Sequence, residues 1–192
     1  MEELFQATSF ETERLVLRTM TLNDIDFIYD LFSAPETNKY SEYEDIKSRE
    51  EAIDLYDKFM KPGSPTHFRL GVELKETQEL VGTLGFYAYN KEHKRAEMGF
   101  DLLKSHWGKG IMTEAVRALI RYGFEEMELN RIEATVDLEN IRSIRLLERM
   151  GFMKEGRLRE RHFYKVRYHD ELVFGILKED WINWVSRANR NI

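Results

Sequence analysis

Hydrophobic residues in the first half of the chain occur in short segments that are separated by polar turns. Four such segments have the alternating or continuous apolar pattern of strands, and they are Arg14–Arg18, His67–Leu74, Leu80–Tyr89 and Arg95–Leu103. The polar turns at residues 75–79 and 90–94 are short. Because short connections join antiparallel neighbours, the last three segments are expected to form an antiparallel meander.

A helical spacing of apolar residues appears twice between the first strand and this meander. Thr21, with Asp24 three residues later, predicts a capped helix start. A second helix is predicted from Ser48 to Met60, and residues 62–65, with two prolines and a glycine, end it. The residues expected on its inward face are Ala52, Ile53, Leu55, Tyr56 and Phe59.

The second half of the chain continues this mixture of helices and strands. After Gly110, apolar residues recur at helical spacing as far as Phe124, which predicts an amphipathic helix. Asn140 opens a further helix, and Gly151 is expected to end it in the left-handed conformation, with Phe152 folding back over the last turn. The remaining predicted elements are strands over residues 131–136, 157–166 and 170–177 and a helix over residues 178–190.

The predicted order of elements is β-α-α-β-β-β-α-β-α-β-β-α. This order predicts a mixed α/β fold, with a mostly antiparallel sheet flanked by helices. The length of 192 residues suits a single domain over residues 1–192. We expect residues 1–11 to be an N-terminal extension and residues 178–192 to be the closing helix.

Composition narrows the classes of function. The net charge of −6 disfavours nucleic-acid binding through a basic face. The chain has no cysteine, which excludes disulfides, thiolate zinc sites and cysteine nucleophiles. Its five histidines show no metal-ligand spacing, so no metal is predicted. No signal peptide and no apolar run near the ~20 residues that span a bilayer are visible, which predicts a cytoplasmic protein that does not bind membranes.

The stretch HWGKGIMTEA, residues 106–115, places two glycines around a lysine where a helix begins. Backbone N–H groups at a helix start are unpaired and lie at the positive end of the dipole. Because Gly108 and Gly110 have no side chains, a phosphate could approach these N–H groups. A simple tight turn would also explain the two glycines. The stretch lacks the Walker pattern, and Thr113 stands where a dinucleotide fingerprint has its third glycine, which argues against an NAD-binding oxidoreductase.

The helix from Asn140 supplies a second motif, in which Ser143 follows at the third position and Gly151-Phe152 ends the segment. Together with the strand and glycine loop before it, this order resembles the GNAT superfamily of acyl-CoA-dependent N-acyltransferases. The resemblance runs from Glu13 to Trp181. It is closest to the RimJ/RimL-type branch, the ribosomal-protein N-terminal acetyltransferases, through four further segments: residues 12–18, 96–100, 107–110 and 113–115.

The resemblance implies a binding site for coenzyme A. In the family, the backbone of the glycine loop seats the diphosphate of the cofactor, and pantetheine fits where the preceding strand parts from its neighbour at a bulge, here expected at Gly99. Ser105 stands where the family has Gln or Arg. The cofactor-binding residues implied are Phe100, Leu102, Trp107, Gly108, Lys109, Gly110, Ile111, Met112, Thr113, Asn140 and Ser143.

The family also implies roles for catalytic residues. Glu97 is chosen as the base, acting directly or through water, although it could instead be a surface carboxylate or one that is salt-bridged to Arg95. Asp101 is the reserve. Ser143 is assigned as a hydrogen-bond donor to the departing thiolate, because Leu147 stands where many relatives have a tyrosine acid. Asn140 caps its helix and helps to hold the cofactor.

The function that this resemblance implies is an acetyl-CoA-dependent N-acetyltransferase. Without a cysteine to carry the acetyl group, transfer is expected to be direct, in a ternary complex. The favoured acceptor is a protein N-terminal amine; polyamines, aminoglycosides and other small amines are alternatives, as is an acyl-CoA-binding sensor with little catalysis. Acidic residues at positions 36, 42, 44 and 45 would suit a cationic acceptor, and the Trp181/Trp184 helix with the final strands could form a homodimer surface.

Overall fold

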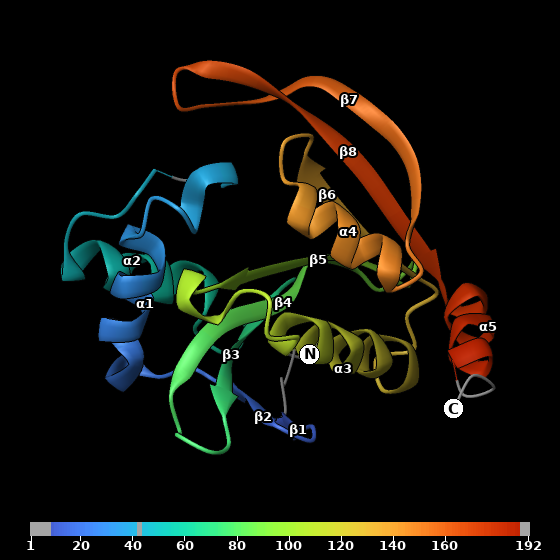
Figure 1. Ribbon diagram of the computed structural model, residues 1–192, viewed down its shortest axis with the longest axis horizontal. Helices are drawn as coiled ribbons and strands as arrows, with labels where there is room; N and C mark the ends of the chain where they lie inside the picture. The colour runs from blue at the N-terminus through green and yellow to red at the C-terminus, as the bar shows by residue number, and fades with distance from the viewer. Residues whose placement is uncertain (1–8, 42–43, 189–192) are drawn as a thin grey trace.

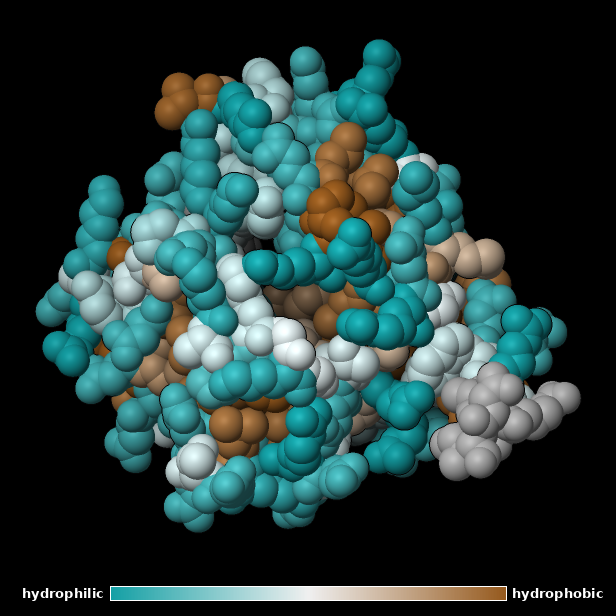
Figure 2. Space-filling view, in the orientation of Figure 1, coloured by the Kyte–Doolittle hydropathy of each residue, from teal (hydrophilic) through white to brown (hydrophobic). Residues whose placement is uncertain are grey.

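The computed structural model describes residues 9–41 and 44–188 (Figure 1). Most of the surface in the same view is polar (Figure 2). The strands are β1 Phe10–Glu11, β2 Leu15–Thr19, β3 Phe68–Leu74, β4 Leu80–Asn90, β5 Arg95–Leu102, β6 Arg131–Asp137, β7 Met153–Tyr164 and β8 Arg167–Leu177. The α-helices are α1 Ile25–Ser33, α2 Arg49–Phe59, α3 Ile111–Glu125, α4 Ile141–Arg149 and α5 Lys178–Ala188, and the short 3-10 helices are η1 Leu22–Asp24, η2 Asn38–Tyr40 and η3 Lys104–His106.

The strands form one eight-stranded sheet in the order β1-β2-β3-β4-β5-β6-β8-β7. All neighbours are antiparallel except β5 and β6, which are parallel and are joined through α3. The predicted mixed α/β fold with a mostly antiparallel sheet is therefore confirmed. The parallel pair lies in the middle of the sheet, and this is where the site is built.

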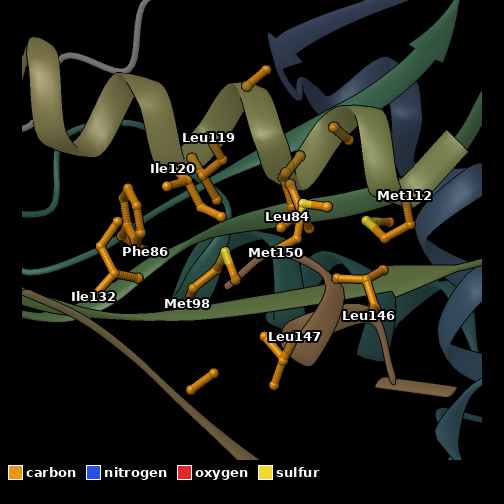
Figure 3. Close-up of a cluster of buried hydrophobic side chains, with 14 of the residues drawn as sticks. Leu84, Phe86, Met98, Met112, Leu119, Ile120, Ile132, Leu146, Leu147 and Met150 are labelled. Carbon is orange, nitrogen blue, oxygen red and sulfur yellow. The ribbon is translucent and has the colours of Figure 1, made fainter. Parts of the chain in front are cut away.

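One face of the sheet is covered by α3, α4 and α5. Figure 3 shows Leu119 of α3 and Leu147 of α4 reaching the same apolar cluster as Phe86 and Met98 of the strands. These four side chains are at most 2% exposed. Burial of this face supplies most of the apolar stabilisation of the fold.

The opposite face carries α1 and α2, which have a smaller core of their own around Met20, Ile28 and Leu31. Arg69 of β3 lies on this face, with its guanidinium carbon 5.9 Å from the ring centroid of Phe32 in α1. Helices therefore cover both faces of the strands that lead to the parallel pair.

The predicted helix boundaries agree with the caps that the structure contains. Thr21 and Asp24 form the expected capping box, although the turn that they cap is the 3-10 helix η1, directly before α1. Ser48 caps α2. Gly151 has a φ of +90°, and the N–H of Phe152 donates to Leu147 O over 3.1 Å, so α4 ends in the left-handed conformation as predicted.

Some predictions of the strands and faces were wrong. Phe10 and Glu11 pair with β2, so part of the expected N-terminal extension belongs to the sheet. The last two strands begin earlier than predicted, because cross-strand bonds form along charged residues that have no apolar alternation. Ile53 is 39% exposed rather than inward, since only Ala52 and Tyr56 of α2 are buried.

The β7–β8 hairpin arches over the molecule and reaches the segment that contains η2 (Figure 1). At its tip, Lys165 Nζ donates to Asn38 O over 2.5 Å. In α5, Trp181 is buried in the core and stacks on Trp184 with ring centroids 5.1 Å apart. The tryptophan that was expected at a dimer surface is thus covered by its own chain, and the homodimer stays a prediction.

Candidate functional site

The central strands β5 and β6 form a fork. They pair only where Arg95–Glu97 lies beside Arg131–Glu133, although β5 continues to Leu102 and β6 to Asp137. Beyond Glu97 the side of β5 that faces β6 is therefore free of strand pairing. The fork leaves backbone N–H and C=O groups available to a ligand that extends between the strands.

The family resemblance led us to expect a bulge at Gly99, but the fork does not arise from one. Gly99 pairs with Gly85 in an unbroken register between β4 and β5, and the irregularity of this ladder lies beyond Tyr87. There Ala88 has a φ of +50°. The strands part because β6 diverges, while β5 stays paired to β4.

Both glycines of the loop have a backbone conformation that other residues rarely adopt. Gly108 and Gly110 each have a φ of +76°, in the left-handed region that favours glycine. Gly110 is the N-cap residue of α3, and no side chain caps this helix. The N–H groups of the first turn, which cannot bond within the helix, are thus available to an anion at the positive end of the dipole.

Side chains from the turn between β1 and β2 and from α3 hold this loop in place. Arg14 Nη1 donates to Lys109 O over 3.1 Å, and Arg14 Nε pairs with Glu114 over 2.6 Å. The hydroxyl of Thr12 also donates to Glu114 over 2.6 Å. Burial would raise the pKa of Glu114, but the hydrogen bonds from Thr12 and Arg14 outweigh it and hold the pKa below its usual value.

A groove of about 980 Å³ runs from the loop into the fork, and Figure 2 shows the surface hollowed at the centre of that view. Nearly all the residues proposed to bind the cofactor line it: Phe100, Leu102, Trp107, Gly108, Gly110, Ile111, Met112, Thr113, Asn140 and Ser143. Lys109 does not line it, and the carbonyl of Lys109 accepts a hydrogen bond from Arg14. Ser105, in the Gln/Arg position of the family, does not line it either.

Cationic side chains stand along the α4 side of this groove. The guanidinium carbon of Arg142 lies 4.1 Å from the ring centroid of Trp107, whose Nε1 donates to Leu102 O over 2.8 Å. Arg149 Nη2 donates to Thr113 Oγ1 over 3.0 Å. A groove with helix-terminal N–H groups at one end and arginines along one wall suits a ligand with several phosphates.

A second cavity, of about 360 Å³, lies on the other side of the fork, and we name it the acceptor pocket. Aromatic residues of α1 and α2, Phe32 and Phe59, form part of its wall. The residues that line both this pocket and the groove are Thr37, Tyr40, Phe100, Asp101, Asn140 and Ser143. The two cavities therefore meet at one junction, to which β5, the start of α4 and the η2 segment all contribute.

Glu97 lies beside the acceptor pocket and has neutral partners. Its Oε1 accepts hydrogen bonds from Tyr87 OH over 2.9 Å and from Thr135 Oγ1 over 2.6 Å. Tyr87 and Thr135 line the pocket, whereas Glu97 does not. Arg95 pairs with Glu133 and not with Glu97, so the alternative of a simple Arg95 ion pair was wrong. Burial and the Glu97 carboxylate raise the pKa of Tyr87 well above its usual value.

Asp101 lies directly at the junction. Its carboxylate pairs with Arg69, and the Asp101 side chain is 21% exposed. Burial raises the pKa of Asp101, and the attraction of Arg69 only partly offsets this. Asp101 therefore has the position of a proton acceptor, whereas Glu97 reaches the pocket through the hydroxyls of Tyr87 and Thr135.

Asn140 and Ser143 present polar groups at the junction from the first turn of α4. Asn140 Oδ1 accepts the backbone N–H of Ser143 over 3.2 Å, which caps the helix as predicted. Leu147 is fully buried and lines neither cavity. Tyr40, from η2, instead brings a phenol to the junction.

A buried polar cluster next to the pocket had no sequence signal. Asp137 Oδ2 accepts from Tyr164 OH over 2.6 Å and is 2.8 Å from His169 Nδ1, while Asp137 Oδ1 accepts the N–H of Glu139 over 2.7 Å. Burial would raise the pKa of Asp137, but these hydrogen bonds outweigh it and lower the pKa. The cluster fastens the β7–β8 hairpin to the turn that carries Asn140.

Asp137→Asn is expected to lower the free energy of unfolding at pH 7 by about 2 kcal/mol, because hydrogen bonds to a buried charge are weakened. A carboxylate whose pKa is lowered on folding stabilises the protein above its unfolded pKa of 3.8 and loses this effect as the pH falls. Urea unfolding at pH 7 and below pH 4 should show the difference shrinking in acid. Asp26→Asn, at a side chain 73% exposed, is the control and should cost almost nothing.

Of the acidic residues that were expected to face a cationic acceptor, the three that the structure describes do not line the acceptor pocket. Glu36 pairs with Lys104 over 2.7 Å beside the groove, and Asp45 lies 4.0 Å from Lys165. Glu44 is exposed, and Glu42 lies outside the described residues. Within residues 9–41 and 44–188, no three His, Asp or Glu side chains form a group that could hold a metal ion, and no helix is long and apolar enough to cross a membrane.

Comparisons with known proteins agree with this geometry. Residues 14–153 match the family model described as an acetyltransferase (GNAT) domain. An N-acetyltransferase of Bacillus licheniformis, p20, is 42% identical over 173 residues, which cover 88% of this chain and 96% of the relative. A GNAT acetyltransferase structure from Bacillus anthracis superimposes with a TM-score of 0.80 at 30% identity, covering 90% of this chain and 99% of that one.

A further solved structure is of spermidine N-acetyltransferase from Vibrio cholerae in complex with CoA and spermine. It superimposes with a TM-score of 0.80 at 28% identity, and the match covers 90% of this chain and 100% of that chain.

Proposed function

The chain belongs to the GNAT family and is an acetyl-CoA-dependent N-acetyltransferase, and from this premise we propose that its acceptor is the N-terminal α-amine of a polypeptide. The observation that carries the proposal is the junction, where a phosphate-binding groove and a separate pocket meet at Phe100, Asp101, Asn140 and Ser143. A donor in the groove and an amine in the pocket would meet there without an enzyme-bound acetyl group.

The groove fits the parts of acetyl-CoA in order. Backbone N–H groups at Gly110 and in the first turn of α3 would bind the diphosphate. The free side of β5 beyond Glu97 would pair with pantetheine, and a backbone N–H there would stabilise the oxyanion that forms on the thioester carbonyl. The thioester carbon would then lie at the junction, next to Ser143.

The reaction needs one proton acceptor and a group that stabilises the thiolate. The amine nitrogen forms a bond to the thioester carbon, the C–S bond breaks, and the sulfur leaves with the bonding electron pair. Glu97, whose Oε1 accepts hydrogen bonds from Tyr87 and Thr135, takes the amine proton directly or through a water, with Asp101 as the alternative base. The hydroxyl of Ser143 donates a hydrogen bond to the sulfur, because Leu147 lies in the core.

A peptide α-amine suits this site for two reasons. Its pKa of about 8, against about 10.4 for lysine, leaves a useful neutral fraction at pH 7. The pocket wall also combines apolar residues, such as Phe32 and Phe59, with hydroxyl and carboxylate groups. Such a wall accommodates the first side chain of a peptide and its main chain. The resemblance to the RimJ/RimL-type branch supports the same acceptor, and a cytoplasmic location stays a prediction.

A spermidine-like polyamine is the second candidate, because the Vibrio cholerae relative was solved with CoA and spermine. The pocket wall contains the carboxylates of Asp137 and Glu171, which could attract a second ammonium. Glu171, however, already lies beside Arg161 and His162, although its buried Oε2 accepts no hydrogen bond. Asp137 is enclosed by Tyr164 and His169, and the third carboxylate of the wall, Asp101, pairs with Arg69. This observation favours the peptide.

An acceptor screen tests the proposal. The protein is incubated with acetyl-CoA and either peptides with free N-termini or spermidine and spermine; thiol release is followed, and mass spectrometry locates the acetyl group. We expect acetylation of the α-nitrogen, with acetyl-blocked peptides as the control. Turnover of polyamines alone would select the second candidate, and CoA binding without thiol release for any amine would indicate a sensor.

A further inference from the structure

Arg69 holds its guanidinium in one fixed position in the wall of the acceptor pocket. Its Nε donates to Thr83 Oγ1 over 2.9 Å, and its Nη2 donates to the Asp101 carboxylate. The side chain is 19% exposed and lies over the ring of Phe32. Contacts on three sides fix the guanidinium, as is needed for a group that recognises a ligand by direction.

The third nitrogen of this guanidinium, Nη1, has no hydrogen-bond acceptor among the residues that the structure describes. A Cβ at position 99 would lie 3.7 Å from Nη1 and 3.1 Å from the Tyr87 ring. Because residue 99 is glycine, the space beside Nη1 stays open. Nη1 is not among the buried atoms without a partner, so its N–H groups are open to water and can donate to an oxygen of a bound molecule.

We propose that Arg69 Nη1 binds the carbonyl oxygen next to the reactive amine, so that the enzyme recognises an α-amino carbonyl group rather than an amine alone. This inference rests on the proposed function, and it names the chemical feature of the acceptor that the pocket selects.

The position of Asp101 supports this assignment. In an α-amino carbonyl group the nitrogen and the oxygen are separated by three covalent bonds and lie about 3 Å apart. Asp101 lines the junction and contacts Arg69 directly, so an amine at the junction would bring its carbonyl oxygen towards the guanidinium. The Asp101 carboxylate also offsets the positive charge that would otherwise repel an ammonium. A linear polyamine has no oxygen for Nη1 to bind.

Two small acceptors separate recognition of the carbonyl from recognition of the amine. Alaninamide and isopropylamine are both branched primary amines, and only alaninamide has the carbonyl. For each acceptor, kcat/KM of Arg69→Gln is compared with that of the wild-type protein, so the different amine pKa values cancel. We expect a loss of about tenfold or more for alaninamide and a change below about twofold for isopropylamine.

Arg95→Gln is the matched control, because Arg95 lies on the same sheet, pairs with Glu133 and does not line the pocket. Arg95→Gln should have the same kcat/KM as the wild-type protein for both alaninamide and isopropylamine. Arg69→Lys keeps the charge beside Asp101 but lacks the planar fork, and it should lose the carbonyl preference even where Arg69→Gln does not fold. Equal losses for both acceptors would overturn the proposal, since Arg69 would then only hold Asp101. Acetyl-CoA binding without turnover of any peptide that has a free N-terminus would instead refute the proposed function.

Discussion

Glu97→Gln is expected to lower kcat at pH 7 by about 10²- to 10³-fold and to leave the affinity for acetyl-CoA unchanged. Glutamine keeps the shape of the side chain and can accept hydrogen bonds from Tyr87 and Thr135, but it cannot take up the amine proton. Because the change removes a role in the transition state only, kcat and kcat/KM should fall together. Steady-state kinetics with the best peptide, together with an acetyl-CoA titration, would measure both quantities.

Glu133→Gln is the control for this change. Glu133 is the register neighbour of Glu97 on β6, but it is ion-paired with Arg95 and Arg131. Its loss should affect stability more than turnover. If Glu97→Gln instead shows unchanged turnover across pH 6 to 9, the proton is accepted by Asp101, whose raised pKa and position at the junction make it the alternative, or by water.

Gly110→Val is expected to weaken acetyl-CoA binding by about 100-fold. A β-branched residue at a φ of +76° is strained. Relief of that strain would rotate the first N–H groups of α3 away from the diphosphate. Hydrogen bonds to a charged group are each worth about 1.5–3 kcal/mol, so losing one or two of them accounts for the expected loss of affinity. Calorimetric titration with acetyl-CoA would measure the change.

Gly63→Val is the matched control for the loop. Gly63 also has a positive φ, of +107°, and it lies in the turn after α2, where an added Cβ would have no neighbouring atom within 4 Å. The substitution should lower stability by a similar amount without changing the affinity for acetyl-CoA. A folded Gly110→Val protein with intact binding would mean that the two glycines only form a tight turn.

Elements with a strong period could be predicted from the sequence. The helical spacing from Met112 to Phe124 places α3 correctly, because one apolar face must reach the core. Thr21, Ser48 and Gly151 mark helix ends by local chemistry that does not depend on the rest of the fold. The two-residue strand β1 and the charged start of β7 carry no such pattern, since only pairing with a neighbouring strand defines them.

Residues that line the groove could be predicted where a motif lies within one segment of the chain. The glycine loop, Asn140 and Ser143 belong to continuous stretches, and they line the groove. Arg69, Thr83 and Asp101 meet only through the register of three strands, and Asp137 meets Tyr164 and His169 only through the hairpin. No spacing along the chain encodes either cluster. The fork itself depends on how far β5 and β6 stay paired. Their pairing ends at Glu97, and the glycine at position 99 gave the wrong position and cause for this separation.

The most direct test of the account is a titration of the ¹⁵N-labelled protein with coenzyme A, followed amide by amide by NMR spectroscopy. We expect the largest shift changes at Gly108, at Gly110–Thr113 and along β5 beyond Glu97, because those backbone groups would bind the diphosphate and pantetheine. Saturable binding that leaves all of these amides unchanged and perturbs another surface would contradict it.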